Sequence, residues 1–424
     1  MSTPDQTQDS ATVGVSAPAR TADRLLAESA ALFGERGYDA ATTRELAARL
    51  GITKASLYHH IENKDDLLYR ISTESLKRTS AAVREVWETA PAEVRLRQMI
   101  AVHMLGTFEA QALYRVALLE LRRLTPDRRR EVTVLRDAYA QMFRSAVRQD
   151  QADGRIRPEL DSGVVTLTLL GILNWPVFWS SHPREAVPGV ADFYADMFLH
   201  GTAGPTLSTA GDDSAGPFAE TTPEPPSTST DAPARPVRTA ANVTTEAVLL
   251  FDEVGFHAAS TRMLAERLGI TKATLYHHIK NKDDLLYRIC RTSVDETVAP
   301  VIEASESSPA ADRLRQMART HLRCVLGDRV FHRVAVIESR SLSPDRLAEV
   351  DQARTDYSRL FLTAIKQDQA DGRIDPALDP RLICTALMGM LIWPLFWYDE
   401  ARNTTPDALA DFIVDLLRTG VEPS

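Results

Sequence analysis

Small polar and basic side chains gather in one short stretch, TKASLYHHIENK at residues 53–64, and their natural chemistry is hydrogen bonding. Lys54 and Ser56 can donate hydrogen bonds to base edges, and threonine or alanine methyl groups can contact the methyl group of thymine. Longer side chains can reach phosphate oxygens, and the N–H groups at a helix N-terminus favour anions. The candidates for phosphate contact are Tyr58, His59 and Lys64.

Two short helices must position this stretch. Thr42 has a glutamate three residues later, which is the pattern of a capping box, and Gly51 ends the short helix that follows. Thr53 caps a second helix, expected from Lys54 to Ile61. Two short helices joined by a turn that contains glycine predict a helix-turn-helix, whose second helix enters the major groove of DNA.

The same stretch occurs twice in the chain. Residues 43–70 and 261–288 are identical at 24 of 28 positions, and the offset of 218 residues holds onward without a gap, as QDQADGRI at 149–156 and 367–374 shows. A solenoid repeat spans only about 20–50 residues, so this period is too long for a solenoid. The sequence therefore predicts the duplication of a whole protein of about 200 residues.

Each copy carries helical periodicity throughout, so the expected fold class is all-α: two tandem units, each a three-helix DNA-binding domain followed by a helical bundle. The stretch between the copies is rich in Pro, Ser, Thr, Gly and Ala and is typical of a flexible tether. The expected boundaries are a disordered tail at 1–19, domains at 20–70 and 71–201, the linker at 202–236, and domains at 237–288 and 289–420.

One helix of each bundle is apolar on nearly every side. These segments are VVTLTLLGILNWPVFW at 164–179 and its counterpart at 382–397. A helix of this kind must be buried on more than one face, and a small bundle rarely covers it completely. We therefore expect each to pack against a partner subunit.

Composition excludes several classes of function. The chain has a net charge of −9, but DNA binding depends on the local distribution of charge. We find no nucleotide-binding, hydrolase or metalloprotease motif and no run of about 18 apolar residues, so we expect neither an enzyme nor a membrane span. The three scattered cysteines suit buried thiols in the cytoplasm. Adjacent histidines at 59–60 lack partners at metal-site spacing, so no metal and no cofactor are expected.

Residues 33–70, FGERGYDAATTRELAARLGITKASLYHHIENKDDLLYR, resemble the N-terminal signature of the TetR (tetracycline-repressor-like) family, and residues 251–288 resemble it equally well. The resemblance implies a ligand-responsive regulator, by default a repressor, that leaves a palindromic operator on double-stranded DNA when a small molecule fills the bundle. The final helices resemble the branch that senses acyl-CoA thioesters and related lipids. The DNA-facing positions that the resemblance implies are Thr42, Thr53, Lys54, Ser56, Tyr58, His59, Lys64, Ser260, Thr271, Lys272, Thr274, Tyr276, His277 and Lys282.

The covalent tandem departs from the usual family homodimer. We expect one chain to form the pseudo-dimer that other members build from two chains, with further self-association left open. The two recognition helices differ only at Ser56 and Thr274, so the half-sites should be nearly the same and one or more helical turns apart, about 34–36 Å per turn. The alternatives are an interaction module that has lost DNA binding and a helical-bundle enzyme.

Polar side chains on otherwise apolar bundle helices are the candidates for an effector pocket, although each is individually more often a satisfied core or surface group. The adjacent Arg122 and Arg123 are more often solvated than ligand-binding. The expected pocket residues are His103, Glu120, Asn174, Trp175, His321, Glu338 and Trp393.

Overall fold

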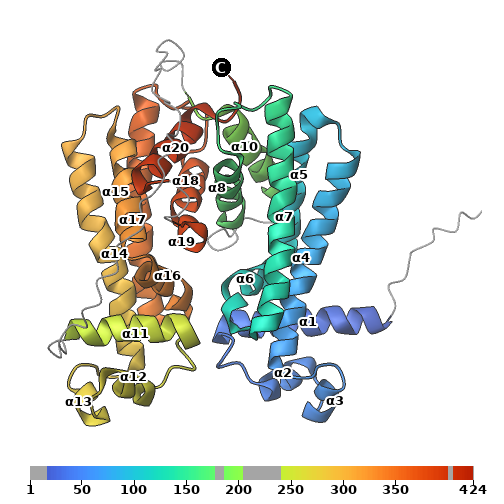
Figure 1. The fold of residues 1–424 in the computed structure, drawn as a ribbon, viewed down its shortest axis with the longest axis vertical. Coiled ribbons are helices and arrows are strands. Elements are labelled where there is room, and N and C mark those ends of the chain that lie inside the picture. Colours follow the sequence, from blue (N-terminus) through green and yellow to red (C-terminus); the bar gives the residue numbers. More distant parts are fainter. Residues whose placement is uncertain (1–16, 177–185, 204–239, 400–403, 424) are drawn as a thin grey trace, which may run out of the picture.

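Helices make up nearly all of the computed structural model, which describes residues 17–176, 186–203, 240–399 and 404–423 (Figure 1). Within these ranges no strand forms, and a single isolated bridge joins Ala203 to Ile374. The all-α prediction is confirmed. The predicted tail at 1–19 falls almost entirely, and the predicted tether largely, outside the described residues.

The described helices of copy one (residues 17–203) follow the order that the caps predict. They are α1 (Ala17–Arg36), α2 (Thr43–Leu50), α3 (Lys54–Tyr58), α4 (Lys64–Thr89), α5 (Ala92–Glu109), α6 (Gln111–Leu119), the 3-10 turn η1 (Leu121–Arg123), α7 (Pro126–Ala152), α8 (Ser162–Asn174) and α10 (Val187–His200).

Copy two (residues 240–423) repeats this order. Its elements are α11 (Ala240–Val254), α12 (Thr261–Leu268), α13 (Lys272–Tyr276), α14 (Lys282–Ser307), α15 (Arg313–Gly327), α16 (Arg329–Glu338), the 3-10 turn η3 (Ser339–Ser341), α17 (Pro344–Ala370), α18 (Pro380–Ile392), α19 (Pro394–Trp397) and α20 (Pro406–Thr419). We call the first three helices of each copy its head and the remaining helices its body.

Local sequence signals set the ends of the head helices. Thr42 and Glu45 form the predicted capping box, and Gly51 ends α2 in the left-handed conformation with a φ of 69°. The second helix is shorter than predicted, because the backbone leaves the helix at His59 and α3 ends at Tyr58. Leu57 and Ile61, the predicted inward pair, are both buried in the core of the head.

The apolar helices of the two copies pack against each other. A Cβ on Gly171 of α8 would lie 3.1 Å from the carbonyl oxygen of Gly389 in α18, and a Cβ on Gly389 would lie 2.6 Å from the Gly171 oxygen. Only glycine permits this approach of two backbones. The partner predicted for each apolar helix is thus the other copy of the same chain, over the part of 164–179 that the structure describes.

One hydrophobic core spans both bodies, whereas a smaller core in each copy joins the head to the adjacent ends of α4, α6 and α7 or of α14, α16 and α17. Among the described residues, one stretch, Pro380–Trp397, has the length and apolarity of a membrane-crossing helix. In the structure 61% of this stretch is buried, because its first part is the helix α18 that packs against α8.

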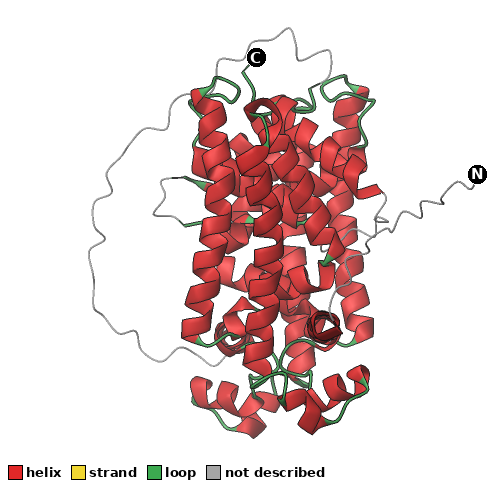
Figure 2. Cartoon of the chain, turned by 90° about the vertical axis from the view of Figure 1, so that its right-hand side faces the viewer, coloured by secondary structure: helices red, strands yellow, loops and turns green. Residues whose placement is uncertain are grey.

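The two heads lie side by side at one end of the molecule, and the C-terminus lies at the opposite end (Figures 1 and 2). The first helix of each body, α4 in copy one and α14 in copy two, is long and begins beside the head. Residue 202, which the sequence analysis placed in the tether, is buried here: Thr202 donates hydrogen bonds to the carbonyl oxygens of Leu417 (2.8 Å) and Arg418 (3.0 Å).

Candidate nucleic-acid interface and cavities

The two recognition helices present the same exposed surface. Thr53 accepts a hydrogen bond from the Ser56 backbone at 3.0 Å, and Thr271 accepts the equivalent bond from Thr274 at 3.1 Å. These caps fix the first turn of a helix that has only five residues. Exposed side chains on the two helices and at their caps are Thr53, Lys54, Tyr58, His59, Thr271, Lys272, Tyr276 and His277.

Each recognition helix pairs a lysine with an exposed tyrosine. The Lys54 ammonium lies 5.9 Å from the centre of the Tyr58 ring, and Lys272 lies 5.8 Å from that of Tyr276. Both tyrosines are 46% exposed, although each ring is large and mostly apolar. An exposed aromatic ring with a polar hydroxyl and a neighbouring cation suits a surface that contacts phosphate and sugar.

The caps of the preceding helices differ between the copies. In copy one the hydroxyl of Thr42 donates to the Glu45 carboxylate at 2.9 Å. In copy two Met263 takes the place of that glutamate, and the Ser260 hydroxyl only accepts from the Met263 backbone, at 3.1 Å. Thr42 and Ser260 are both exposed at the predicted interface, but a carboxylate accompanies only the first.

Lys64 and Lys282 lie differently from the sequence interpretation. The Lys64 ammonium donates to the carbonyl oxygens of Asp39 (3.0 Å) and Ala41 (2.9 Å) and lies over the Tyr38 ring. In copy two Lys282 donates to the carbonyl oxygens of Phe256, His257 and Ala259 and lies over the Phe256 ring. Both ammonium groups are half-buried, and two carbonyl oxygens bind Lys64 while three bind Lys282, so these lysines hold the loop before the helix-turn-helix. The long lysine stem allows this return, which spacing alone does not reveal.

No group of three or more potential metal ligands occurs among the described residues. His59 and His277 are exposed, and each donates its backbone N–H to the preceding turn as the helix ends. Their side chains are available to a partner in solution.

A cavity of about 430 Å³ opens inside the body of copy two, between α14, α15, α17 and α18. His321 lines it and makes a hydrogen bond to the Tyr357 hydroxyl at 2.6 Å. Burial lowers the pKa of His321 to about 3, so this histidine is neutral. Trp175 closes the cavity from copy one, so the wall is built from both copies. His321 and Trp175 therefore lie where a pocket was expected.

In copy one, the residues aligned with the wall of this cavity form a packed cluster. Tyr114 donates its hydroxyl to Asn174 at 2.6 Å, and its ring meets the His103 ring edge-on with centroids 5.8 Å apart. His103 in turn makes a hydrogen bond to Tyr139, and burial lowers its pKa to about 3. His103 and Asn174 are thus packed core groups, although only the Nδ1 of the His103 ring has a hydrogen-bond partner among the described residues.

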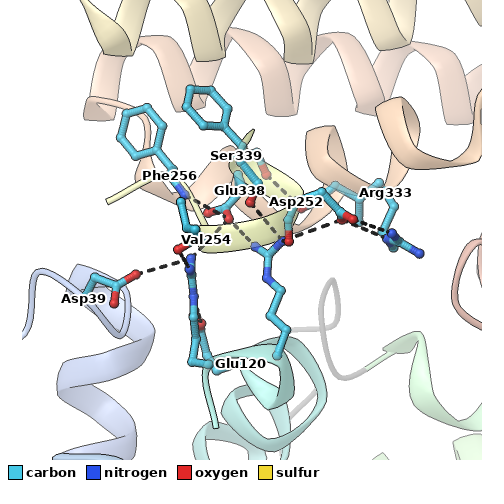
Figure 3. Close-up of polar contacts among 12 residues, drawn as sticks. Asp39, Glu120, Asp252, Val254, Phe256, Arg333, Glu338 and Ser339 are labelled. Atoms are coloured by element: carbon cyan, nitrogen blue, oxygen red, sulfur yellow. Dashed lines mark hydrogen bonds and ion pairs between the residues drawn. The ribbon is translucent and has the colours of Figure 1, made fainter. Parts of the chain in front are cut away.

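Glu120, Glu338 and Trp393 do not line this cavity, contrary to expectation. Trp393 packs against Gly171 at the contact between α8 and α18. Glu338 accepts hydrogen bonds from Arg122, from Arg123 (3.2 Å) and from the Phe256 backbone (3.2 Å) at the junction between copies (Figure 3). The Glu120 carboxylate lies 3.6 Å from the Nε atom of Arg123. For Glu338 and Trp393, contacts with residues more than 200 positions away, Arg122 and Gly171, decide the placement.

Arg122 and Arg123, which the sequence favours as solvated side chains, are half-buried or buried at the junction between the copies. From η1 of copy one they reach the C-terminal end of α11 in the second head, where Arg122 donates to the Phe251 carbonyl (3.3 Å) and Arg123 donates to that of Val254. The last carbonyl groups of a helix attract cations. The sequence does contain a signal for this asymmetry. Ser341 stands in copy two where copy one has Arg123, so the contacts of η1 with the second head and of η3 with the first head cannot be equivalent.

A second cavity, of about 370 Å³, lies between the two copies. Its wall includes Arg115 from copy one together with Arg340 and Arg354 from copy two. It shares Trp175, Val336 and Arg354 with the cavity inside copy two. The two cavities are therefore neighbours with a common wall.

These features define a class of protein, the helix-turn-helix regulator with a helical sensor body. The family model "Bacterial regulatory proteins, tetR family" matches residues 25–71 and 243–289, and the model "Tetracyclin repressor-like, C-terminal domain" matches 89–202 and 307–421. The matches cover well over half of the chain and occur once in each copy. The chain belongs to the TetR family of transcription regulators and is a tandem duplication.

Relatives match one copy at a time. The fatty acid metabolism regulator protein of Bacillus subtilis is 22% identical over 177 residues, which are 41% of this chain and 91% of the relative. The repressor KstR2 of Mycolicibacterium smegmatis is 28% identical over 155 residues, 35% of this chain and 74% of that protein. The solved structure of PfmR from Thermus thermophilus is 33% identical and covers 42% of this chain and 97% of its own, with a TM-score of 0.39.

Proposed function

We propose that this TetR-family regulator is a repressor that reads one near-palindromic operator with the two heads of a single chain. The observation that carries the proposal is the placement of two exposed, matching recognition helices at one end of two bodies that share a hydrophobic core (Figure 2). In a homodimeric regulator the second head comes from a second chain. Here the tether makes that pairing intramolecular, at an effective concentration of order millimolar.

The matching recognition helices support the near-palindrome. Their sequences, KASLY and KATLY, differ by one methyl group at Ser56 and Thr274, and their caps have the same geometry. Because one hydroxyl replaces another, we expect both helices to select almost the same bases. The Thr274 methyl adds an apolar contact, which favours a thymine at one half-site.

A small hydrophobic or acyl-CoA-like effector is the proposed ligand of the body. Apolar surface makes up most of the lining of the cavity in copy two, and polar and basic side chains such as His321, Arg359 and Arg381 also reach it, a mixture that suits a small-molecule site. The name of the Bacillus subtilis relative refers to fatty acid metabolism, which agrees with a lipid-like effector.

The mass of the protein on a duplex from its own upstream region tests this proposal. We expect mass photometry at nanomolar concentration to give one chain per duplex. Two chains per duplex, with no complex of one chain, would contradict the proposal that a single chain binds the whole operator. A duplex with one half-site scrambled is the matched control and should bind weakly. Absence of any complex at low salt would favour an interaction module that has lost DNA binding.

A further inference from the structure

The guanidinium group of Arg123 contacts both heads and both bodies (Figure 3). It donates hydrogen bonds to the carbonyl oxygen of Val254, at the end of α11 in the second head, and to Glu338 of the second body at 3.2 Å. It also forms ion pairs with Asp39 of the first head at 3.3 Å and with Glu120 of its own body at 3.6 Å. The side chain is only 8% exposed. One buried cation therefore links the four parts of the molecule.

The contacts on the heads fall at the loop that precedes each helix-turn-helix. Asp39 belongs to this loop in the first head, where carbonyl oxygens of the loop bind Lys64. Val254 directly precedes the loop in the second head, where carbonyl oxygens of the loop bind Lys282. Each loop ends at the N-cap residue of α2 or α12, the helices that pack against α3 and α13. Because these bonds tie each loop to the helices on both sides, a displacement of the loop should displace the recognition helix.

Arg123 lies close to the axis that relates the two copies. Glu120 and Glu338 are aligned residues of the two copies, and the guanidinium group lies within 3.6 Å of both. A group that contacts both members of a symmetry-related pair lies near the axis between them. The residue of copy two that aligns with Arg123 is Ser341, whose hydroxyl lies 3.9 Å from a Cβ at Gly37. A second arginine at this position would need the space and the partners that Arg123 already uses.

Glycine in each loop allows the close contact between the heads. A Cβ at Gly255 of the second head would lie 1.5 Å from a guanidinium nitrogen of Arg123, so the cation occupies the place that a side chain would take. A Cβ at Gly37, the aligned residue of the first head, would lie 3.0 Å from Nε2 of His257 in the second head. Residues of both heads and both bodies line a cavity of only about 20 Å³ here. The loops of the two heads thus contact each other and Arg123, which leaves little freedom in the distance between the heads.

We propose that Arg123 is a positioning residue for operator binding: it sets the separation of the two recognition helices and thereby the spacing of half-sites that the chain accepts. This inference rests on the proposed function, in which one chain reads two half-sites, and adds the residue that determines the specificity for spacing. Recognition helices in successive major grooves lie about 34–36 Å apart. One additional base pair between the half-sites moves the second half-site by about 3.4 Å and turns it by about 35°. Heads held at one separation should reject such an operator.

The separation of the heads is measured first, in the full chain without DNA. Spin labels at Arg44→Cys and Arg262→Cys, two aligned and exposed positions of α2 and α12, report it by double electron–electron resonance. Cys324→Ser removes the half-buried native thiol, and the other two cysteines are buried. We expect a narrow distance distribution in the parent chain and a broader one with Arg123→Ser. Arg130→Ser, which removes an exposed arginine of α7, is the matched control and should keep the narrow distribution.

Arg123→Ser should leave the chain folded, because it introduces the residue that copy two carries at the aligned position. Arg122 also continues to bind the second head through the Phe251 carbonyl and the second body through Glu338. A distance distribution of unchanged width in a folded Arg123→Ser chain would overturn the inference.

A series of duplexes then measures the consequence for binding. The probe is the operator located by footprinting on the upstream region of the gene, lengthened or shortened by one or two base pairs between its half-sites, and fluorescence anisotropy gives the affinities. The parent chain should prefer the original spacing. Arg123→Ser should reduce this preference about tenfold, which is the usual size of a coupling between two sites, and should keep its affinity for a duplex with a single half-site. Equal weakening on every duplex, the single half-site included, would show that Arg123 acts through stability alone and would overturn the inference.

A swapped chain tests the position of the arginine near the axis. Arg123→Ser with Ser341→Arg moves the arginine to copy two, and Asp39→His with His257→Asp moves its carboxylate partner as well. This chain should recover the narrow distance distribution and the preference for spacing, whereas Ser341→Arg alone should not preserve them, because two arginines then compete for one place. Failure of the swapped chain to recover either property would contradict the inference. A parent chain that binds no duplex would refute the proposed function, and the resonance measurement would still decide whether Arg123 positions the heads.

Discussion

At the scale of single residues, exposure distinguishes the side chains that we propose to contact DNA from those that stabilise the fold. Lys54 and Lys272 are exposed on the recognition helices, whereas Lys64 and Lys282 donate to backbone carbonyl groups of the preceding loop. Both pairs are lysines in the same stretch, but only their surroundings reveal the different roles. The two pairs should therefore respond differently to the same substitution.

Lys54→Ala together with Lys272→Ala should weaken operator binding by roughly 1–3 kcal/mol for each head, since each head loses a base or phosphate contact. Fluorescence anisotropy on the operator measures the loss, and the melting temperature should stay unchanged because both side chains are exposed. Lys366→Ala, an exposed lysine of α17, is the control for net charge. Unchanged affinity in the double variant would refute the assignment of the recognition face.

Lys64→Ala should act through stability instead. Burial lowers the pKa of this lysine, and its ammonium is held by the oxygen atoms of Asp39 and Ala41. Removal leaves carbonyl groups without a donor, and we expect a loss of roughly 1–3 kcal/mol in the free energy of unfolding. Chemical denaturation measures it. A variant that keeps its stability but loses affinity for DNA would restore the phosphate role predicted from sequence.

The buried histidines predict loss of stability in acid. Burial lowers the pKa of His103 and His321 to about 3, so both are neutral in the folded chain but take up a proton near pH 6.5 when unfolded. Their contribution is complete above pH 6.5 and falls between pH 6.5 and about 3. Between pH 6.5 and 5 the loss should be about 2 kcal/mol for each histidine. Unfolding by urea at the two pH values checks this, and a His103→Asn variant should show the smaller difference.

At the scale of elements, the 3-10 turns η1 and η3 make the two heads unequal. Arg122 and Arg123 of η1 bind the end of α11, and a Cβ at Gly255 would lie 1.5 Å from the Arg123 guanidinium. The matching position of η3 holds Ser341, which lies 3.9 Å from a Cβ at Gly37. Two arginines thus bind the second head to the body of copy one, whereas η3 offers the first head only one, and Arg123 itself contributes a 3.3 Å ion pair with Asp39 of the first head.

Arg123→Ser, which copies η3, should loosen α11 more than α1, because α11 loses the bond to the Val254 carbonyl, whereas the first head loses only the 3.3 Å ion pair between Arg123 and Asp39. The buried Glu338 would lose its ion pair with Arg123. Breaking a buried ion pair costs about 3–5 kcal/mol of stability. The cost should be smaller here because Arg122 still pairs with Glu338. Hydrogen exchange resolved by segment is the measurement. Arg130→Ser removes an exposed pair with Asp127 and should change neither helix. Equal loss of protection in α1 and α11 would contradict the asymmetry.

Most of the helices could be predicted from the sequence, because their determinants are local. Thr42, Thr53 and Asn63 each cap a helix as expected, and the duplication indicated two units. The recognition helix is shorter than predicted, because nothing in its sequence marks the end of the helix at His59. Glu338 and Trp393 were misplaced because their partners, Arg122 and Gly171, lie more than 200 residues away in sequence.

At the scale of the whole molecule, the shared core of the two bodies holds the copies together independently of the chain between them. The core includes Leu169 and Leu173 from α8 with Leu387 and Leu391 from α18. A protease site engineered into residues 204–239 should therefore yield two fragments that stay associated after cleavage. Size-exclusion chromatography at micromolar concentration measures this. At nanomolar concentration operator binding should become dependent on protein concentration, since the effective concentration of the tethered chain is lost. Separation at micromolar concentration would contradict a stable shared core.

Position 34 in copy one is a glycine, whereas the aligned position 252 in copy two is an aspartate. This difference bears on how such a regulator can change over generations. In a homodimer every substitution is made in both subunits at once, so an aspartate lost from one junction is lost from the other as well. The joined gene removes that constraint, because each junction is encoded separately. One copy can then keep an ion pair that stabilises the assembly, such as that between Asp252 and Arg333, while the other copy changes it.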